Sequence, residues 1–178
     1  MAAAAQGATT GPRVRARLEE LGLSLPAVAA PVADYVPAVA TGVHVHTSGQ
    51  LPFVDGVLPR TGKVGADVTP EQAAELAATC CLNALAAIED LTGDLDRVVR
   101  IVKLTGYVAS DPGFTAQPAV INGASELLGA VFADAGRHAR SAVGVAVLPL
   151  DAPVELDLLV EVDSPLVPGP APVSVPAG

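Results

Sequence analysis

The pattern of apolar and polar positions predicts strands and helices that alternate along most of the chain. Apolar residues recur at helical spacing in three segments and alternate with polar residues in others. In chain order, the sequence predicts a helix over 14–21, strands over 35–40 and 43–48, a helix from 70 to Gly93, a strand over 97–109, a helix from 117 or 118 to Gly136, and strands over 141–148 and 154–162. Thr69 and Gln72 match a capping box, which marks the start of the first long helix.

The last two strands are predicted to form a hairpin. Residues 149–153 carry a proline at each end, which is typical of a turn. If Leu148 pairs with Pro153, Glu155 lies opposite Ala146, and Arg140 is then roughly 20 Å away at about 3.3 Å per residue. In this register Arg140 and Glu155 of one chain cannot hold the same small ligand. They would share one only across a contact between subunits.

Arg140 is unusual because it opens an apolar strand. An arginine in that place is paired, solvated or used to bind a ligand. One interpretation is a salt bridge at the end of the strand. The other is a ligand site, because a guanidinium group matches a carboxylate or a phosphate in bidentate geometry. The residues around Arg140 leave both interpretations open.

The order of the elements predicts an α+β fold. Two strands, a helix, a strand, a helix and two strands are typical of a mixed sheet with two helices packed on one face. The other face of the sheet is too apolar for contact with water, which indicates assembly into an oligomer. We expect one domain over residues 12–162, a disordered tail rich in alanine, glycine and threonine over 1–11, and a disordered proline-rich tail over 163–178.

The composition argues against a nucleic-acid partner and against a membrane partner. The chain of 178 residues carries a net charge of −9, which argues against a general nucleic-acid partner. We find neither a signal peptide nor an apolar run long enough for a membrane span, so we expect a cytoplasmic protein without a membrane partner. His44 and His46 share a strand face and could bind a metal with His138. No acidic or cysteine residue stands at a suitable spacing, so we expect no metal.

Three segments together resemble the RidA family, also called YjgF/YER057c/UK114. They are Thr47-Ser-Gly-Gln-Leu-Pro52, the strand from Val98 to Asp111, and Arg140-Ser-Ala-Val with Leu148-Pro149 and Val154-Glu155. The resemblance covers residues 30 to 162. It implies a chorismate-mutase-like fold and a homotrimer with sites between subunits. It also implies the hydrolysis of enamines and imines such as 2-aminoacrylate to a 2-keto acid and ammonia, with no cofactor.

The resemblance also implies roles for five residues. Arg140 matches the arginine that binds the substrate carboxylate, and Glu155 matches the glutamate that positions water or moves a proton. Tyr35, Ser48 and Asn122 match the other positions of the substrate pocket.

The chain departs from the small members of the family at several positions. These include Asp34, Pro37, Ala142 and a longer loop over 52–67. It looks more like a larger subgroup, also called endoribonuclease L-PSP or chorismate-mutase-like. An alternative function is a trimer that binds a 2-keto acid and regulates without turnover. A ribonuclease is disfavoured by the acidic charge and the 3% aromatic content, and chorismate mutase activity would rest on fold analogy alone.

Overall fold

The computed structural model describes residues 13–28 and 34–166, so the predicted tail over 1–11 and most of that over 163–178 lie outside the described residues. The helices and strands are α1 (Arg13–Glu20), β1 (Ala38–Thr41), β2 (His44–Thr47), α2 (Pro70–Thr92), β3 (Val98–Ala109), α3 (Gln117–Phe132), β4 (Ala139–Val145) and β5 (Val154–Val162). Short 3-10 turns cover Leu95–Arg97, Ala133–Gly136 and Pro149–Asp151. Within the described residues, no helix is long and apolar enough to cross a membrane.

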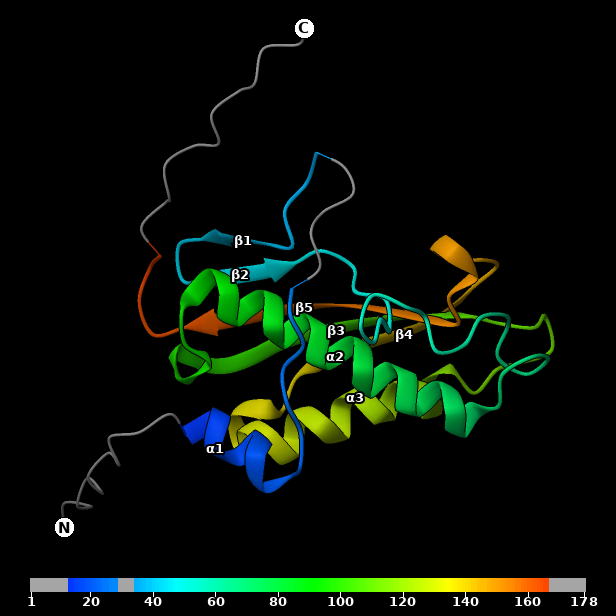
Figure 1. Ribbon diagram of the computed structural model, residues 1–178, viewed down its shortest axis with the longest axis horizontal. Helices are drawn as coiled ribbons and strands as arrows, with labels where there is room; N and C mark the ends of the chain where they lie inside the picture. The colour runs from blue at the N-terminus through cyan, green and yellow to red at the C-terminus, as the bar shows by residue number, and fades with distance from the viewer. Residues whose placement is uncertain (1–12, 29–33, 167–178) are drawn as a thin grey trace, which may run out of the picture.

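The five strands form one sheet in the order β1-β2-β5-β3-β4. β3 and β4 run parallel, with α3 as the crossover between them, and the other neighbouring strands are antiparallel. Figure 1 shows α2 and α3 side by side across one face of this sheet, with α1 next to α3. The predicted α+β fold, a mixed sheet with two helices on one face, is therefore confirmed.

Helix α2 begins and ends where the sequence predicts. The Thr69 side chain accepts a hydrogen bond from the Gln72 backbone N–H at 3.3 Å, and the Gln72 side chain accepts one from the Thr69 N–H at 3.1 Å. At the other end Gly93 has a φ of 79°, a left-handed conformation that glycine adopts without steric cost. Helix α3 ends at Phe132 rather than at the predicted Gly136, because a 3-10 turn occupies the last four residues.

The core lies between the sheet and the two long helices. Apolar residues alternate along the sequence of β5, and all five of these alternating residues are buried: Val154, Leu156, Leu158, Val160 and Val162. Regular alternation along the predicted strand over 97–109 would place Ile101 and Leu104 on opposite faces of the sheet, and this expectation is wrong. The pairing of β3 with β5 shifts register after Val98 and again after Ile101, and these irregularities break the alternation of faces. Ile101 and Leu104 are consequently both buried.

The predicted hairpin between the last two strands is wrong. β3 lies between β4 and β5, so these two strands are not neighbours in the sheet. The segment after β4 instead forms a 3-10 turn in which Leu150 and Asp151 have φ values of 57° and 58°. The prolines did mark a change of direction, but the chain crosses past β3 before it re-enters the sheet. The register that placed Glu155 opposite Ala146 therefore does not exist.

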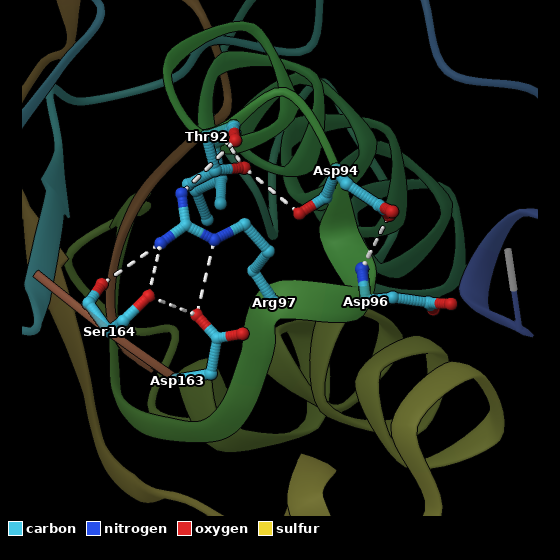
Figure 2. Close-up of polar contacts among 7 residues, drawn as sticks. Thr92, Asp94, Asp96, Arg97, Asp163 and Ser164 are labelled. Atoms are coloured by element: carbon cyan, nitrogen blue, oxygen red, sulfur yellow. Dashed lines mark hydrogen bonds and ion pairs between the residues drawn. The ribbon is translucent and has the colours of Figure 1, made fainter. Parts of the chain in front are cut away.

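A polar cluster holds the chain after β5 against the start of β3. Figure 2 shows Arg97 at its centre, where its Nε donates to Asp163 Oδ1 at 3.1 Å. Its Nη2 donates to the Ser164 carbonyl oxygen at 3.0 Å, and its Nη1 reaches the Thr92 carbonyl oxygen at the end of α2 at 3.4 Å. Arg97 therefore joins the ends of α2 and β5 to the start of β3.

Candidate functional site

Arg140 lies on the edge strand β4 and faces helix α3. It pairs with Leu104 of β3, and paired residues of neighbouring strands direct their side chains to the same face of a sheet. Leu104 is fully buried against the helices, so Arg140 lies on the helix-covered side. Its Nη1 donates to Asn122 Oδ1 at 2.8 Å and to Ser125 Oγ at 3.2 Å, and both partners belong to α3. The structure thus brings together Arg140 and Asn122, as the proposed roles require.

These two hydrogen bonds leave one edge of the guanidinium group available. Nη1 carries two hydrogens, and Asn122 and Ser125 accept both. Among the described residues, Nε and Nη2 of Arg140 have no acceptor and no carboxylate lies within salt-bridge distance. The salt bridge considered from the sequence is therefore not formed within this part of the chain. The Nε/Nη2 edge has the geometry of a bidentate carboxylate site.

Glu155 lies on the opposite, open face of the sheet. It pairs with Tyr107 of β3, between the buried residues Val154 and Leu156. Tyr107 donates its hydroxyl hydrogen to Asp157 Oδ2 at 3.2 Å. Partial burial raises the pKa of the Glu155 carboxyl, and the nearby negative charge of Asp157 raises it further. A carboxylate whose pKa is raised is a stronger base than an ordinary glutamate, which suits it to accept and return a proton.

Gly49 and Ser48 lie beside Glu155, at the end of β2. A Cβ atom on Gly49 would overlap with Glu155 Oε1, so the backbone passes directly over the carboxylate. Ser48 donates its hydroxyl hydrogen to the Val36 carbonyl oxygen at 2.6 Å, and its N–H donates to Pro37. Ser48 therefore holds in place the segment that carries Tyr35, a half-exposed side chain. The serine oxygen can still accept a hydrogen bond from a ligand.

The five predicted residues fall into two groups within one chain. Arg140 and Asn122 lie on the helix-covered side, at the sheet edge formed by β4, whereas Glu155 lies on the open face with β3 between it and β4. Ser48 lies close to Glu155 through Gly49. Burial and strand pairing therefore place Arg140 and Glu155 of one chain on opposite faces of the sheet.

Sequence reasoning missed several residues of these groups. Ser125 stands three positions after Asn122 on the same helix face, a spacing that would have indicated a shared partner. His138 was considered as a metal ligand, but it contacts Ser125 instead. His44 and His46 are exposed, and no group of three metal-binding side chains occurs within residues 13–28 and 34–166.

A cavity of about 310 Å³ lies elsewhere, between the segment after α1 and the loop after β2. Its lining includes Gln50, Phe53 and Asn83. The Asn83 amide donates to the carbonyl oxygens of Leu51 and Phe53, which holds this loop against α2. None of the five predicted site residues lines this cavity.

Comparison with known proteins places the chain in a family. Residues 15–162 match the family described as "YjgF/chorismate_mutase-like, putative endoribonuclease". Protein TCP17 of Trypanosoma cruzi is 48% identical over 153 residues, which cover 85% of this chain and 96% of that protein.

Two crystal structures share the fold over most of their length. Atu1372 of Agrobacterium tumefaciens, a protein of unknown function, is 46% identical with a TM-score of 0.79, over 84% of this chain and 92% of Atu1372. A protein of Shewanella oneidensis named as a putative endoribonuclease is 34% identical with a TM-score of 0.81, over 84% and 99% of the two chains. The chain therefore belongs to the YjgF/chorismate-mutase-like family, also called the RidA family, and within it to the larger subgroup.

Proposed function

We propose that this protein is an enamine/imine deaminase that hydrolyses 2-aminoacrylate-type intermediates to 2-keto acids and ammonia. The free Nε/Nη2 edge of Arg140 is the observation that carries the proposal. Two hydrogen bonds from Nη1 to α3 fix the guanidinium plane, so the free edge has a defined direction. In 2-aminoacrylate and its imine tautomer the carboxylate is bonded directly to the reacting carbon. An arginine that binds the carboxylate therefore also places the carbon that water attacks.

Proton transfer in the proposed reaction is assigned to Glu155. The raised pKa of its carboxyl favours exchange of a proton with water or with the leaving nitrogen. No metal or organic cofactor is needed, because an imine carbon is already electrophilic. Tyr35 and Ser48 complete the pocket wall on the Glu155 side in this proposal.

The separation of Arg140 from Glu155 within one chain supports a site formed between subunits of a homotrimer. The open face of the sheet carries exposed apolar side chains, including Val39 and Val143, beside the partly exposed Leu159. Contact with a second subunit would remove this apolar surface from water. The same contact would bring Glu155 of one chain toward Arg140 of its neighbour.

The direct test is the release of ammonia and 2-keto acid from 2-aminoacrylate generated in situ. Arg140→Ala is expected to lower kcat/KM by about 100-fold or more, the scale of losing two hydrogen bonds to a charged group. Arg137→Ala is the matched control, since this side chain is 85% exposed and forms an ion pair with the nearby Asp134. Equal activity in wild type and Arg140→Ala would contradict the proposed anchor.

A second candidate is a regulatory trimer that binds 2-keto acids without turnover. The same free edge of Arg140 favours it, because a 2-keto acid presents the same carboxylate. Calorimetry with pyruvate separates the two functions when Glu155→Gln is included. An enzyme should lose turnover in this variant and keep its affinity for pyruvate. A wild-type protein that binds pyruvate through Arg140 without accelerating hydrolysis would be a binding protein.

Ribonuclease activity, which the family description and the name of the Shewanella relative suggest, has less support. A net charge of −9 repels a phosphate backbone, and the chain has few aromatic side chains for stacking bases. RNA cleavage that persists through repurification and is lost in Arg140→Ala would overturn this judgement.

A further inference from the structure

Two carboxyl groups are neighbours on the open face of the sheet. Glu155 and Asp157 are separated by the buried Leu156, so their side chains leave β5 on the same face, with Cα atoms about 7 Å apart at two residues of strand. Both side chains are partly buried. Carboxylates this close repel each other when both are charged, and one proton bound by the pair relieves the repulsion. The pair therefore has one exchangeable proton to place.

Tyr107 of β3 makes the two carboxyl groups unequal. It pairs with Glu155 across the strands, but its hydroxyl group reaches diagonally to Asp157 and donates to Oδ2 at 3.2 Å. Within the described residues, no group donates a hydrogen bond to the Glu155 carboxylate. A hydrogen bond from a hydroxyl group stabilises the negative charge of a carboxylate. Asp157 is thus placed to hold the charge of the pair, and Glu155 is placed to hold the proton.

Tyr107 is a dependable donor in this arrangement. Partial burial raises the pKa of its hydroxyl group, and the negative charge of Asp157 raises it further. Tyr107 therefore keeps its hydrogen and can only strengthen the charge on Asp157. The raised pKa of Glu155, which has the same two causes, agrees with the difference in hydrogen bonding.

Other charged groups lie further from Glu155 than Asp157 does. The backbone of Gly49, which passes over the carboxylate, adds no charge. In the proposed trimer, Arg140 of the neighbouring chain adds a positive charge, which the carboxylate of a bound ligand offsets. Strand pairing places the remaining titratable groups of this face two or more rows from Glu155: Lys103, His46, Arg100, His44 and Glu161.

We propose that Tyr107 and Asp157 are positioning residues that keep the exchangeable proton of this carboxyl pair on Glu155. Tyr107 acts through its hydrogen bond to Asp157, and Asp157 acts through its negative charge. The location of the proton follows from contacts within the chain, whereas its use in turnover rests on the proposed function.

A proton carried by Glu155 satisfies the balance of imine hydrolysis. Water adds to the imine carbon, a C–O bond forms, the electron pair of the C=N π bond moves to nitrogen, and Glu155 takes one proton of the water. Glu155 then returns this proton to the nitrogen. The second proton of the water reaches the nitrogen as the C–N bond breaks with its electron pair, which leaves a carbonyl group and ammonia. The charge of Asp157 makes Glu155 a stronger base for the first step.

The location of the proton can be measured by ¹³C NMR of the full chain labelled at its glutamate side-chain carboxyl carbons. The signal of Glu155 is identified by its loss in Glu155→Gln. We expect its titration midpoint to move to lower pH in Asp157→Asn, which removes the neighbouring charge. It should also move to lower pH in Tyr107→Phe, because Asp157 then competes for the proton.

Two variants control for the loss of charge and for the change of shape. Asp157→Glu keeps the negative charge and should keep the midpoint of Glu155. Glu161→Gln removes a negative charge from the same face of β5, about 20 Å from Glu155 at six residues of strand, and should leave the midpoint unchanged.

The pH dependence of kcat/KM for 2-aminoacrylate tests the catalytic use of this proton. Below the wild-type midpoint, the fraction of plateau kcat/KM that Asp157→Asn retains should exceed the wild-type fraction by about twofold or more. Its plateau kcat should fall by about two- to tenfold, since Glu155 becomes a weaker base. A purely structural role would lower the plateau without moving the profile.

The NMR and kinetic results separate this proposal from the proposed function. An unchanged midpoint of Glu155 in Asp157→Asn would overturn the proposal, whatever the kinetics show. A less stable Tyr107→Phe with the wild-type midpoint would reduce Tyr107 to a structural contact. A shifted midpoint with an unshifted kinetic profile would support the location of the proton and contradict the use of Glu155 in turnover.

Discussion

A methyl group added at Gly49 should lower the activity of the protein with little effect on its stability. The added Cβ would meet Glu155 Oε1, which is the far end of a flexible side chain rather than a fixed backbone atom. We expect Gly49→Ala to displace the carboxylate and to lower kcat by about tenfold or more, at less than about 1 kcal/mol of unfolding free energy. Ammonia release and urea denaturation measure the two effects.

Gly129→Ala is the control for this substitution, because no atom lies within 4 Å of the Cβ it would add. It should keep full activity. Full activity in Gly49→Ala as well would show that the position of Glu155 does not matter for turnover.

The raised pKa of Glu155 predicts how stability depends on pH. A carboxyl whose pKa is higher in the folded than in the unfolded protein binds its proton more tightly when folded. The free energy of unfolding therefore falls as pH rises from about 4 through the raised folded pKa, and it is level above. Glu155→Gln has no carboxyl group at this position and avoids this loss. The difference between its free energy of unfolding and that of the wild type should therefore increase in its favour as pH rises over this range. Urea denaturation at a series of pH values, at one protein concentration, measures the difference, and a constant difference would contradict the shift.

Individual site residues could be predicted from the sequence only as far as local spacing reaches. Arg140 and Asn122 were expected in one pocket and do form a hydrogen bond. Ser125 was not expected, although helical spacing places it beside Asn122. The contact between Ser125 and His138 depends on the 3-10 turn that folds the chain back after α3, and no periodic pattern in residues 133–136 indicates that turn.

At the level of elements, the packing of α3 on α2 depends on a glycine. A Cβ on Gly123 would overlap with the carbonyl oxygen of Ala74, a backbone atom that cannot move aside alone. We expect Gly123→Ala to lower the unfolding free energy by about 1–3 kcal/mol, the usual cost of overpacking. Urea denaturation beside Gly129→Ala, on the same helix, isolates the effect of contact with α2. Equal stability of the two variants would show that the helices can separate without cost.

The failure of the predicted hairpin shows what local patterns cannot specify. Two apolar strands joined by a proline-bounded segment fit a hairpin as well as they fit two strands that flank a third. The choice is made by α3, which crosses the sheet and sets β4 parallel to β3. The buried residues of β5 could be predicted because apolar and polar residues alternate regularly along it. In β3 two register shifts interrupt the alternation, so Ile101 is buried on the same side as Leu104.

At the level of the whole molecule, the sheet keeps the two halves of the proposed site apart. The helices cover one face of the sheet (Figure 1). Strand pairing places Arg140 on this covered face and Glu155 on the open face. The sequence also led to a site between subunits, but it did so through a hairpin register that is wrong. The structure gives a different reason for the same proposal, because Arg140 and Glu155 lie on opposite faces and β3 separates their strands.

Mixed trimers test whether the site is shared between subunits. Arg140→Ala and Glu155→Gln each remove one half, so each variant alone should be inactive. If one chain supplies Arg140 and its neighbour supplies Glu155, a trimer that contains both variants has one intact interface. Random reassembly of equal amounts should then restore on the order of a quarter of the wild-type activity.

The control is the double variant Arg140→Ala/Glu155→Gln reassembled with Arg140→Ala, which contains no intact arginine and should stay inactive. No recovery in trimers shown by mass to be mixed would mean that each chain forms its own site. That outcome would contradict a site shared between subunits, because the activity lost in each variant would then have to come from within a single chain.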